Sequence, residues 1–224
     1  MQTRWAFILA LTLPIASCGD SPDSVRTSAQ LPQQEALGDE ATMTIEADWI
    51  CIATPRDLAD ISTVVVRVEP TSDETTLKVI EEPDRRTEWR VSNARVIDVL
   101  AGQGVSPGET IQIGRTITRA TVTVNGRAEE RRFVGPGYPG PLTGSAWVLG
   151  LDLAPHSGEQ GVWAAVQGTH GRVALDGKTE DAKVLEAAPG YDGHLQASYA
   201  GRNLEVLESD LDSPAGDSAC QEAE

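Results

Sequence analysis

From Ser62 to Leu185 the chain consists almost entirely of strand-length segments separated by turn residues. The run of β-branched residues from Val64 to Val68 is typical of a strand buried on both faces. Asn125-Gly126 suits a type I′ turn, in which both central residues need positive φ, and predicts a projecting hairpin between residues 116–124 and 127–134. The fold class that this series of strands predicts is mainly β, a small antiparallel barrel or sandwich.

Helical signals lie at the two ends of this strand series. Thr54 followed by Pro55 predicts a helix start, with the threonine as N-cap. After Asp192 the spaced leucines predict a short C-terminal helix, or two helices broken near Gly201.

A long strand is expected from Glu88 to Leu100. Trp89 and Val91 share one of its faces, whereas Ala94 and Val96 fall on the other. A β-bulge changes the phase of a strand in this way, so we expect one between the two pairs.

The chain carries a formal net charge of −16. This acidity argues against nucleic-acid binding, which depends on Lys and Arg to neutralise phosphates. It also argues against electrostatic docking on anionic lipid. Residues 19–48 are polar and acidic without a sustained period, which predicts a disordered tether.

The first residues have the layout of a secretory signal. Arg4 precedes an apolar run from Trp5 to Leu13, and small residues follow. The run is shorter than the roughly 20 apolar residues that span a bilayer. Simple secretion and an uncleaved anchor are alternatives to the interpretation that follows.

Ile15-Ala16-Ser17-Cys18 resembles the lipobox of bacterial lipoproteins. The resemblance implies that residues 1–17 are removed, that the Cys18 thiol receives a diacylglyceryl group, and that the new amine is acylated by a fatty acid such as palmitate. The protein would then be lipid-anchored in the cell membrane or outer membrane, facing the periplasm or the exterior. We therefore expect a signal peptide over 1–17, a lipidated tether over 18–48, a β-barrel domain over 49–208 and an acidic tail over 209–224.

Two cysteines remain after Cys18. Cys51 and Cys220 would lie in an oxidising compartment, where structural disulfides persist, and we expect them to pair. The alternative is two unpaired thiols.

The order of the strands also resembles a known fold. A buried strand, a long bent strand, a Gly-Pro turn, an alternating strand and the Trp147 strand follow one another over Ile61–Leu153. This order is similar to the OB-fold domains of the metalloproteinase-inhibitor and netrin type, and to secreted bacterial proteins. The resemblance implies an OB-like barrel, and no inhibitory residue transfers to this chain.

Motifs for catalysis or metal binding are missing from the sequence. No two of His156, His170 and His194 are closely spaced, so they do not form the spacing of a zinc site. We expect them to be solvent-exposed loop residues. The sequence contains no Gly-x-Ser-x-Gly elbow of the kind that exposes a nucleophilic serine. It also has no phosphate-binding glycine loop between a predicted strand and a predicted helix. The sequence therefore predicts no enzyme, no cofactor and no metal.

The projecting hairpin carries an unusual concentration of arginine in an acidic protein: Arg115, Arg119, Arg127, Arg131 and Arg132. One interpretation is internal pairing with Glu129, Glu130 and the acidic tail. The other is a docking arm for an acidic partner, because Arg forks suit carboxylates.

These observations favour a lipid-anchored, non-catalytic and monomeric envelope protein whose β-domain binds a protein or glycan. The alternatives are an envelope hydrolase or metal-dependent enzyme with a site assembled from distant loops, and a purely structural spacer. Homologues would separate binding from catalysis by showing which surface residues are invariant.

Overall fold

The fold is described from a computed structural model. The structure describes residues 42–44, 52–134, 142–154, 161–168, 170–186 and 194–213. Their helices and strands are, in chain order, β1 (Thr42–Thr44), α1 (Pro55–Ile61), β2 (Val64–Pro70), β3 (Thr75–Glu82), β4 (Arg85–Gly102), β5 (Thr110–Val124), β6 (Arg127–Val134), β7 (Ala146–Leu153), β8 (Val162–Ala165), β9 (Arg172–Leu175), α2 (His194–Tyr199) and α3 (Leu204–Leu211).

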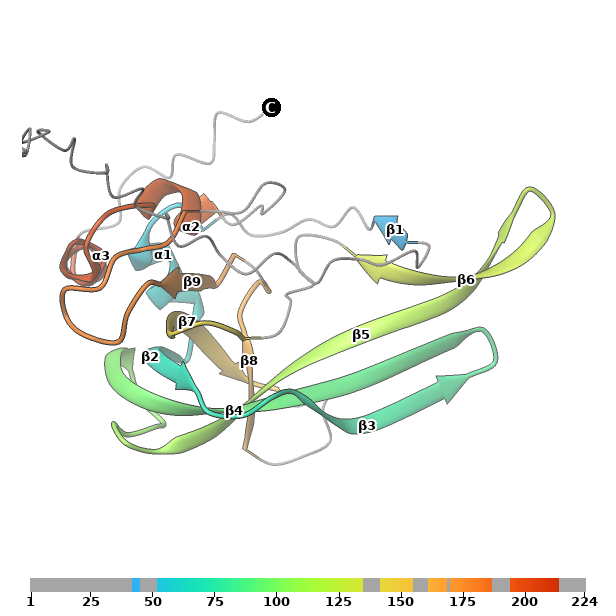
Figure 1. Ribbon diagram of the computed structural model, residues 1–224, viewed down its shortest axis with the longest axis horizontal. Helices are drawn as coiled ribbons and strands as arrows, with labels where there is room; N and C mark the ends of the chain where they lie inside the picture. Colours follow the sequence, from blue (N-terminus) through green and yellow to red (C-terminus); the bar gives the residue numbers. More distant parts are fainter. Residues whose placement is uncertain are drawn as a thin grey trace, which may run out of the picture.

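The protein is mainly β with short C-terminal helices, as predicted (Figure 1). Nine described strands form one sheet in the order β1-β6-β5-β8-β7-β2-β4-β3, with β9 paired to β7. The expectation of a purely antiparallel arrangement is wrong, because β1 is parallel to β6 and β5 is parallel to β8. Both parallel pairs join segments that are distant in sequence, which local turn signals do not reveal.

Five strands pair in a closed circuit. β4 pairs with both β2 and β5, and β8 connects β5 to β7, which pairs with β2. All five contribute buried side chains to one apolar cluster, including Val66, Ala94, Ile113, Leu149 and Trp163. The circuit therefore surrounds the main core.

A second apolar cluster lies between the outer side of the sheet and the three helices, which gather at one end of the molecule (Figure 1). Val65, Val148 and Val173 supply the sheet side of this cluster. Gln196 of α2 is fully buried, and its amide accepts from the Ala174 N–H and donates to the Leu185 carbonyl. These hydrogen bonds join α2 to β9 and to the segment that contains Leu185.

The helix signals are confirmed. Thr54 caps α1 by accepting from the Asp57 N–H at 3.2 Å, and the Asp57 carboxylate accepts in return from the Thr54 N–H at 2.9 Å. The C-terminal helices are separated at Gly201, where φ is +74°. α3 continues to the buried Leu211, three residues beyond the last one assigned to the barrel domain.

The expected β-bulge in the long strand is wrong in position. β4 pairs with β5 in regular register from Arg85 to Arg95, so no residue is inserted between Val91 and Ala94. Val91 and Ala94 face different apolar clusters, which explains the change in the hydrophobic pattern. The irregularities of β4 lie instead near Ile97 and Leu100, against β2.

The predicted hairpin is present, with φ of 51° at Asn125 and 76° at Gly126. It does not project alone. The β3–β4 hairpin runs beside it, because the first part of β4 pairs with β5 (Figure 1). We call residues 74–92 and 114–134 the arm, since these two hairpins extend together from the core.

Candidate binding surface

One face of the arm carries rows of arginine. Residues directly opposite in neighbouring strands share a face of the sheet. Arg119 of β5 stands opposite Arg86 of β4 and Arg132 of β6, and Arg115 stands opposite Arg90. Like charges placed directly opposite destabilise a sheet, so this arrangement needs counter-charges.

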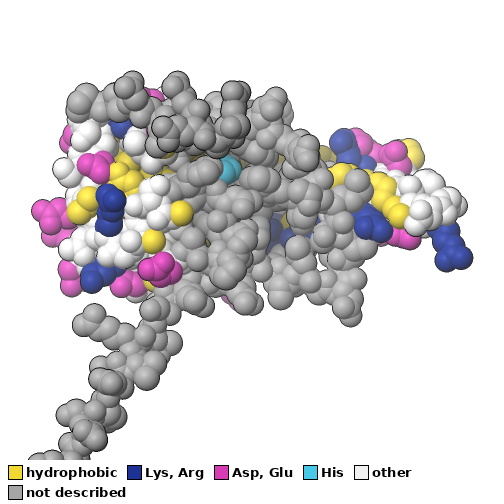
Figure 2. Space-filling view, turned by 90° about the horizontal axis from the view of Figure 1, so that it is seen from above, with side chains coloured by type: hydrophobic (Ala, Val, Ile, Leu, Met, Phe, Trp, Pro, Cys, Tyr) yellow, Lys and Arg dark blue, Asp and Glu magenta, His cyan; other side chains and the backbone are white. Residues whose placement is uncertain are grey.

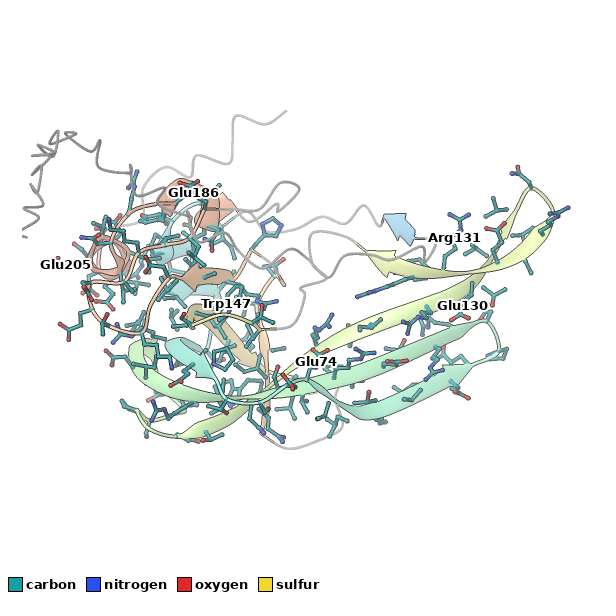
Figure 3. All side chains as sticks on the ribbon, in the orientation of Figure 1. Glu74, Glu130, Arg131, Trp147, Glu186 and Glu205 are labelled. Atoms are coloured by element: carbon teal, nitrogen blue, oxygen red, sulfur yellow. The ribbon has the colours of Figure 1, made fainter. Side chains whose placement is uncertain are left out.

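Two glutamates supply counter-charges to these rows. Glu74 precedes β3 and accepts two hydrogen bonds from Arg115, at 2.5 Å from Nε and 2.8 Å from Nη2. Arg90 lies between the two glutamates, with Nη1 at 3.5 Å from Glu74 and Nη2 at 3.0 Å from Glu88. Figure 3 shows Glu74 where the arm meets the core.

Glu88 is the second counter-charge. Its Oε1 lies 3.1 Å from Nη2 of Arg86 and 3.2 Å from Nη1 of Arg119. Its side chain is 8% exposed, whereas that of Arg86 is 49% exposed. Four arginines and two glutamates thus form a continuous network, which we call the ionic ladder: Glu74, Arg86, Glu88, Arg90, Arg115 and Arg119.

The ladder favours the charged forms of Glu88 and Arg90. Burial alone would raise the pKa of the Glu88 carboxyl, but the hydrogen bond from Arg90 and the positive charges around it hold the pKa below its usual value. Burial would likewise lower the pKa of Arg90, yet contact with Glu88 and Glu74 raises it. Both shifts stabilise the charged forms of Glu88 and Arg90.

The structure distributes the five predicted arginines differently from the sequence-based pairing. Arg131 does pair with Glu129, at 2.7 Å. Arg115 and Arg119 instead pair with Glu74 and Glu88 of the neighbouring hairpin. Arg127 is exposed beside the turn and Arg132 is half-buried. Glu130 and Arg131 lie farther out along the arm than Glu74 (Figure 3).

Sequence reasoning missed the β4 half of the ladder. Arg86, Glu88 and Arg90 alternate at the period of a strand, which places all three on one face. That signal was present in the sequence. Glu74 could not be found in the same way, because only the pairing of β3 with β4 brings it to Arg115.

A polar groove of about 210 Å³ lies near the end of the arm. Its lining joins the β3–β4 turn to the adjacent strands and includes Glu81, Asp84, Arg86, Arg119 and Glu130. In space-filling view the arm extends away from the core with basic and acidic side chains interspersed along it (Figure 2). The groove can therefore offer both donors and carboxylates to a partner.

Among the three histidines, which the sequence predicts to be solvent-exposed, His170 differs from that expectation. It is 5% exposed, so the expectation of a solvent-exposed loop histidine is wrong for this residue. Nearby in sequence, Arg172 is equally buried and places its guanidinium 4.8 Å from the centre of the Trp147 ring. His194 begins α2, and His156 lies outside the described residues.

Other predicted features fall outside the described ranges or concern the chain as a whole. Cys18, Cys51 and Cys220 all lie outside the described residues, so lipid attachment and the disulfide stay predictions. Within the described part, no three or more His, Cys, Asp or Glu side chains form a group that could hold a metal ion. None of the described helices has both the length and the apolar character needed to cross a membrane.

Comparison with known proteins does not extend this description: no family, no curated protein and no solved structure matches the chain.

Proposed function

We propose that the chain is a lipid-anchored, non-catalytic protein of the bacterial cell envelope whose arm binds an acidic protein or glycan. The observation that carries this proposal is the charge of the arm. The arm holds nine basic and seven acidic residues, a net charge of +2 in a chain of −16. The rest of the chain therefore carries −18, and an acidic partner is attracted only to the arm.

The ionic ladder gives the arginine-bearing face of the arm a fixed shape. Glu74 and Glu88 hold the arginine side chains in defined positions, which reduces the conformational entropy lost when a ligand binds. Arginine is well suited to this role because its guanidinium can bind a carboxylate through two parallel hydrogen bonds. Arg85, Arg86 and Arg127 are exposed arginines at the far end of the arm.

The connection between tether and arm supports a membrane-proximal role. β1 lies within the segment expected to be the tether, residues 18–48, and pairs with β6, so the chain reaches the arm before it enters the core. The 24 residues from Cys18 to Thr42 can span at most roughly 80 Å. If Cys18 carries lipid, the arm stays within that distance of the membrane.

For the fold, we propose that the closed circuit of strands is a barrel of the OB type. Five strands enclosing one apolar core are what that fold requires. The arm would then be an extension of the barrel strands β4 and β5.

Binding to short acidic probes tests the proposed activity. The probes are an octaglutamate peptide and a galacturonic-acid oligosaccharide, titrated calorimetrically at low ionic strength. The variant Arg86→Gln/Arg127→Gln should bind whichever of the two probes the parent chain binds about fivefold more weakly than the parent does, because two surface ionic contacts are lost. Arg56→Gln/Arg202→Gln removes the same charge from the end of the molecule where the three helices gather. This variant should bind the probe with an affinity within about twofold of that of the parent chain. An equal loss in both variants, or no binding of either probe by the parent chain, contradicts the proposal.

The anchor has a separate test, the intact mass of the native protein from its membrane fraction. We expect residues 18–224 with a diacylglyceryl group, and a mass increase of two protons on reduction if Cys51 and Cys220 pair. An unmodified polypeptide that starts at another residue would exclude the lipid anchor but leave the arm proposal intact.

A further inference from the structure

The outer edge of β3 is an open template for another strand. β3 ends the order of the sheet, and no described strand pairs with its far side. In Figure 1 it runs along the border of the arm. An edge strand presents unpaired N–H and C=O groups, which natural proteins usually protect with charges or bulges.

Protection of this edge is incomplete. The register against β4 shifts between Thr76 and Lys78, and from there to Glu82 the pairing is regular. All five residues of this regular part are exposed except Ile80, which is half-buried. Val79 is 39% exposed and is one of three large apolar side chains that the described surface exposes.

We propose that a second copy of this chain pairs with β3, antiparallel and symmetrical about Ile80. In this register each Ile80 lies opposite the Ile80 of the second copy. Each Lys78 lies opposite a Glu82, and each Val79 opposite a Glu81. Residues that oppose one another then share a face of the joined sheet, as antiparallel pairing requires.

Charge complementarity favours this occupant. The two Lys78–Glu82 pairs are directly opposite and of opposite sign, which stabilises a strand pair. Within each copy, Glu82 also lies 2.8 Å from Arg85, and Glu81, the other carboxylate of this segment, is opposite Arg86 in the sheet.

Net charge also favours contact at this place. Residues 75–92 contain four basic and four acidic side chains and are neutral, although the whole chain carries −16. Two copies that meet along β3 therefore bring together the part of the protein where mutual repulsion is small.

The expected association is weak. A five-residue strand pair buries less area than the roughly 1,200 Å² or more of a stable interface. Confinement to a membrane surface would raise the effective concentration.

The sequence predicted a monomer, and this proposal departs from that prediction. It does not depend on binding of an acidic partner.

Cysteine trapping in the full chain tests the register. Ile80→Cys places two thiols opposite each other at the symmetry axis, within the separation that a disulfide bridges. Mild oxidation of the native membrane fraction should trap several-fold more homodimer than in Thr123→Cys, an exposed control at the end of β5. Equal trapping in the two variants, or trapping of Ile80→Cys with a different protein only, overturns the proposal.

Charge exchange gives a second test that does not depend on a new thiol. By sedimentation equilibrium, Lys78→Glu should weaken the homodimer about tenfold, because it places like charges opposite each other twice. Lys78→Glu combined with Glu82→Lys should restore it. Failure of the double variant to recover, or a parent chain that stays monomeric at all concentrations, contradicts the pairing.

Discussion

Glu88 is the residue on which the ionic ladder depends most. It is buried, and three arginines from two strands contact its carboxylate. Removing one partner of a buried ionic contact leaves the others desolvated without a counter-charge, which is costly. The same carboxylate therefore adds a link between β4 and β5 and positions arginines of the proposed binding surface.

Glu88→Gln should lower the free energy of unfolding by about 2 kcal/mol at pH 7, because charge-assisted hydrogen bonds are lost. The pKa of Glu88 is lowered in the folded protein, so its contribution is present above its usual pKa and is lost as the pH falls through the folded value. The difference between parent and variant should shrink on acidification to pH 3. Urea unfolding at both pH values measures it.

Glu129→Gln is the matched control, since its pair with Arg131 is more exposed. It should cost less than about 1 kcal/mol. A difference between parent and Glu88→Gln that is unchanged from pH 7 to pH 3 would contradict the electrostatic explanation.

Gly150 is needed for a different reason, the close approach of α1 to β7. A Cβ atom at this position would lie 2.4 Å from Cδ1 of Leu58 and 2.3 Å from Oγ of Ser62. Gly150→Ala should therefore destabilise the protein by about 1–3 kcal/mol through overpacking. The control Gly177→Ala meets nothing closer than 3.7 Å and should change stability little. Thermal unfolding compares the two, and equal melting temperatures would argue against this packing.

Among the helices, strands and turns, the sequence predicted those features that depend on residues close together in the chain. The α1 cap, the break at Gly201 and the turn at Asn125-Gly126 each depend on residues within a few positions of one another. The parallel pairs were not predictable in this way, because each joins strands that are distant in sequence. The β-bulge was predicted at the wrong place in β4 because this strand contributes buried side chains to two different apolar clusters.

The same distinction applies to the candidate site. The arginines of β5 and β6 could be identified by their concentration in the hairpin. Their partners Glu74 and Glu88 could not be assigned, because partner choice follows the register between hairpins that are separated in sequence. Sequence therefore identified the surface and only the structure identified what holds it in shape.

The α1 capping box provides a test at this level. Thr54→Ala removes the hydroxyl that accepts from the Asp57 N–H and should lower the free energy of unfolding by about 1 kcal/mol. Thr54→Ser keeps the acceptor and should be nearly neutral. Urea unfolding distinguishes them, and two variants of equal stability would show that the cap is unimportant.

For the whole molecule, the main feature is the separation of charge between arm and core. The arm carries +2 and the rest of the chain −18. The helix end buries an apolar cluster, whereas the arm is ordered largely by strand pairing and the ionic ladder. The larger apolar packing and the proposed binding surface therefore lie in different parts of the protein.

The most direct test of this account is amide hydrogen exchange of the native protein, with and without the octaglutamate or galacturonic-acid probe. We expect the probe to slow exchange in β3, β6 and the adjoining parts of β4 and β5, with no change near Trp147, His170 and Arg172. Protection confined to those buried residues, with none along the arm, would contradict it and place the functional site in the core.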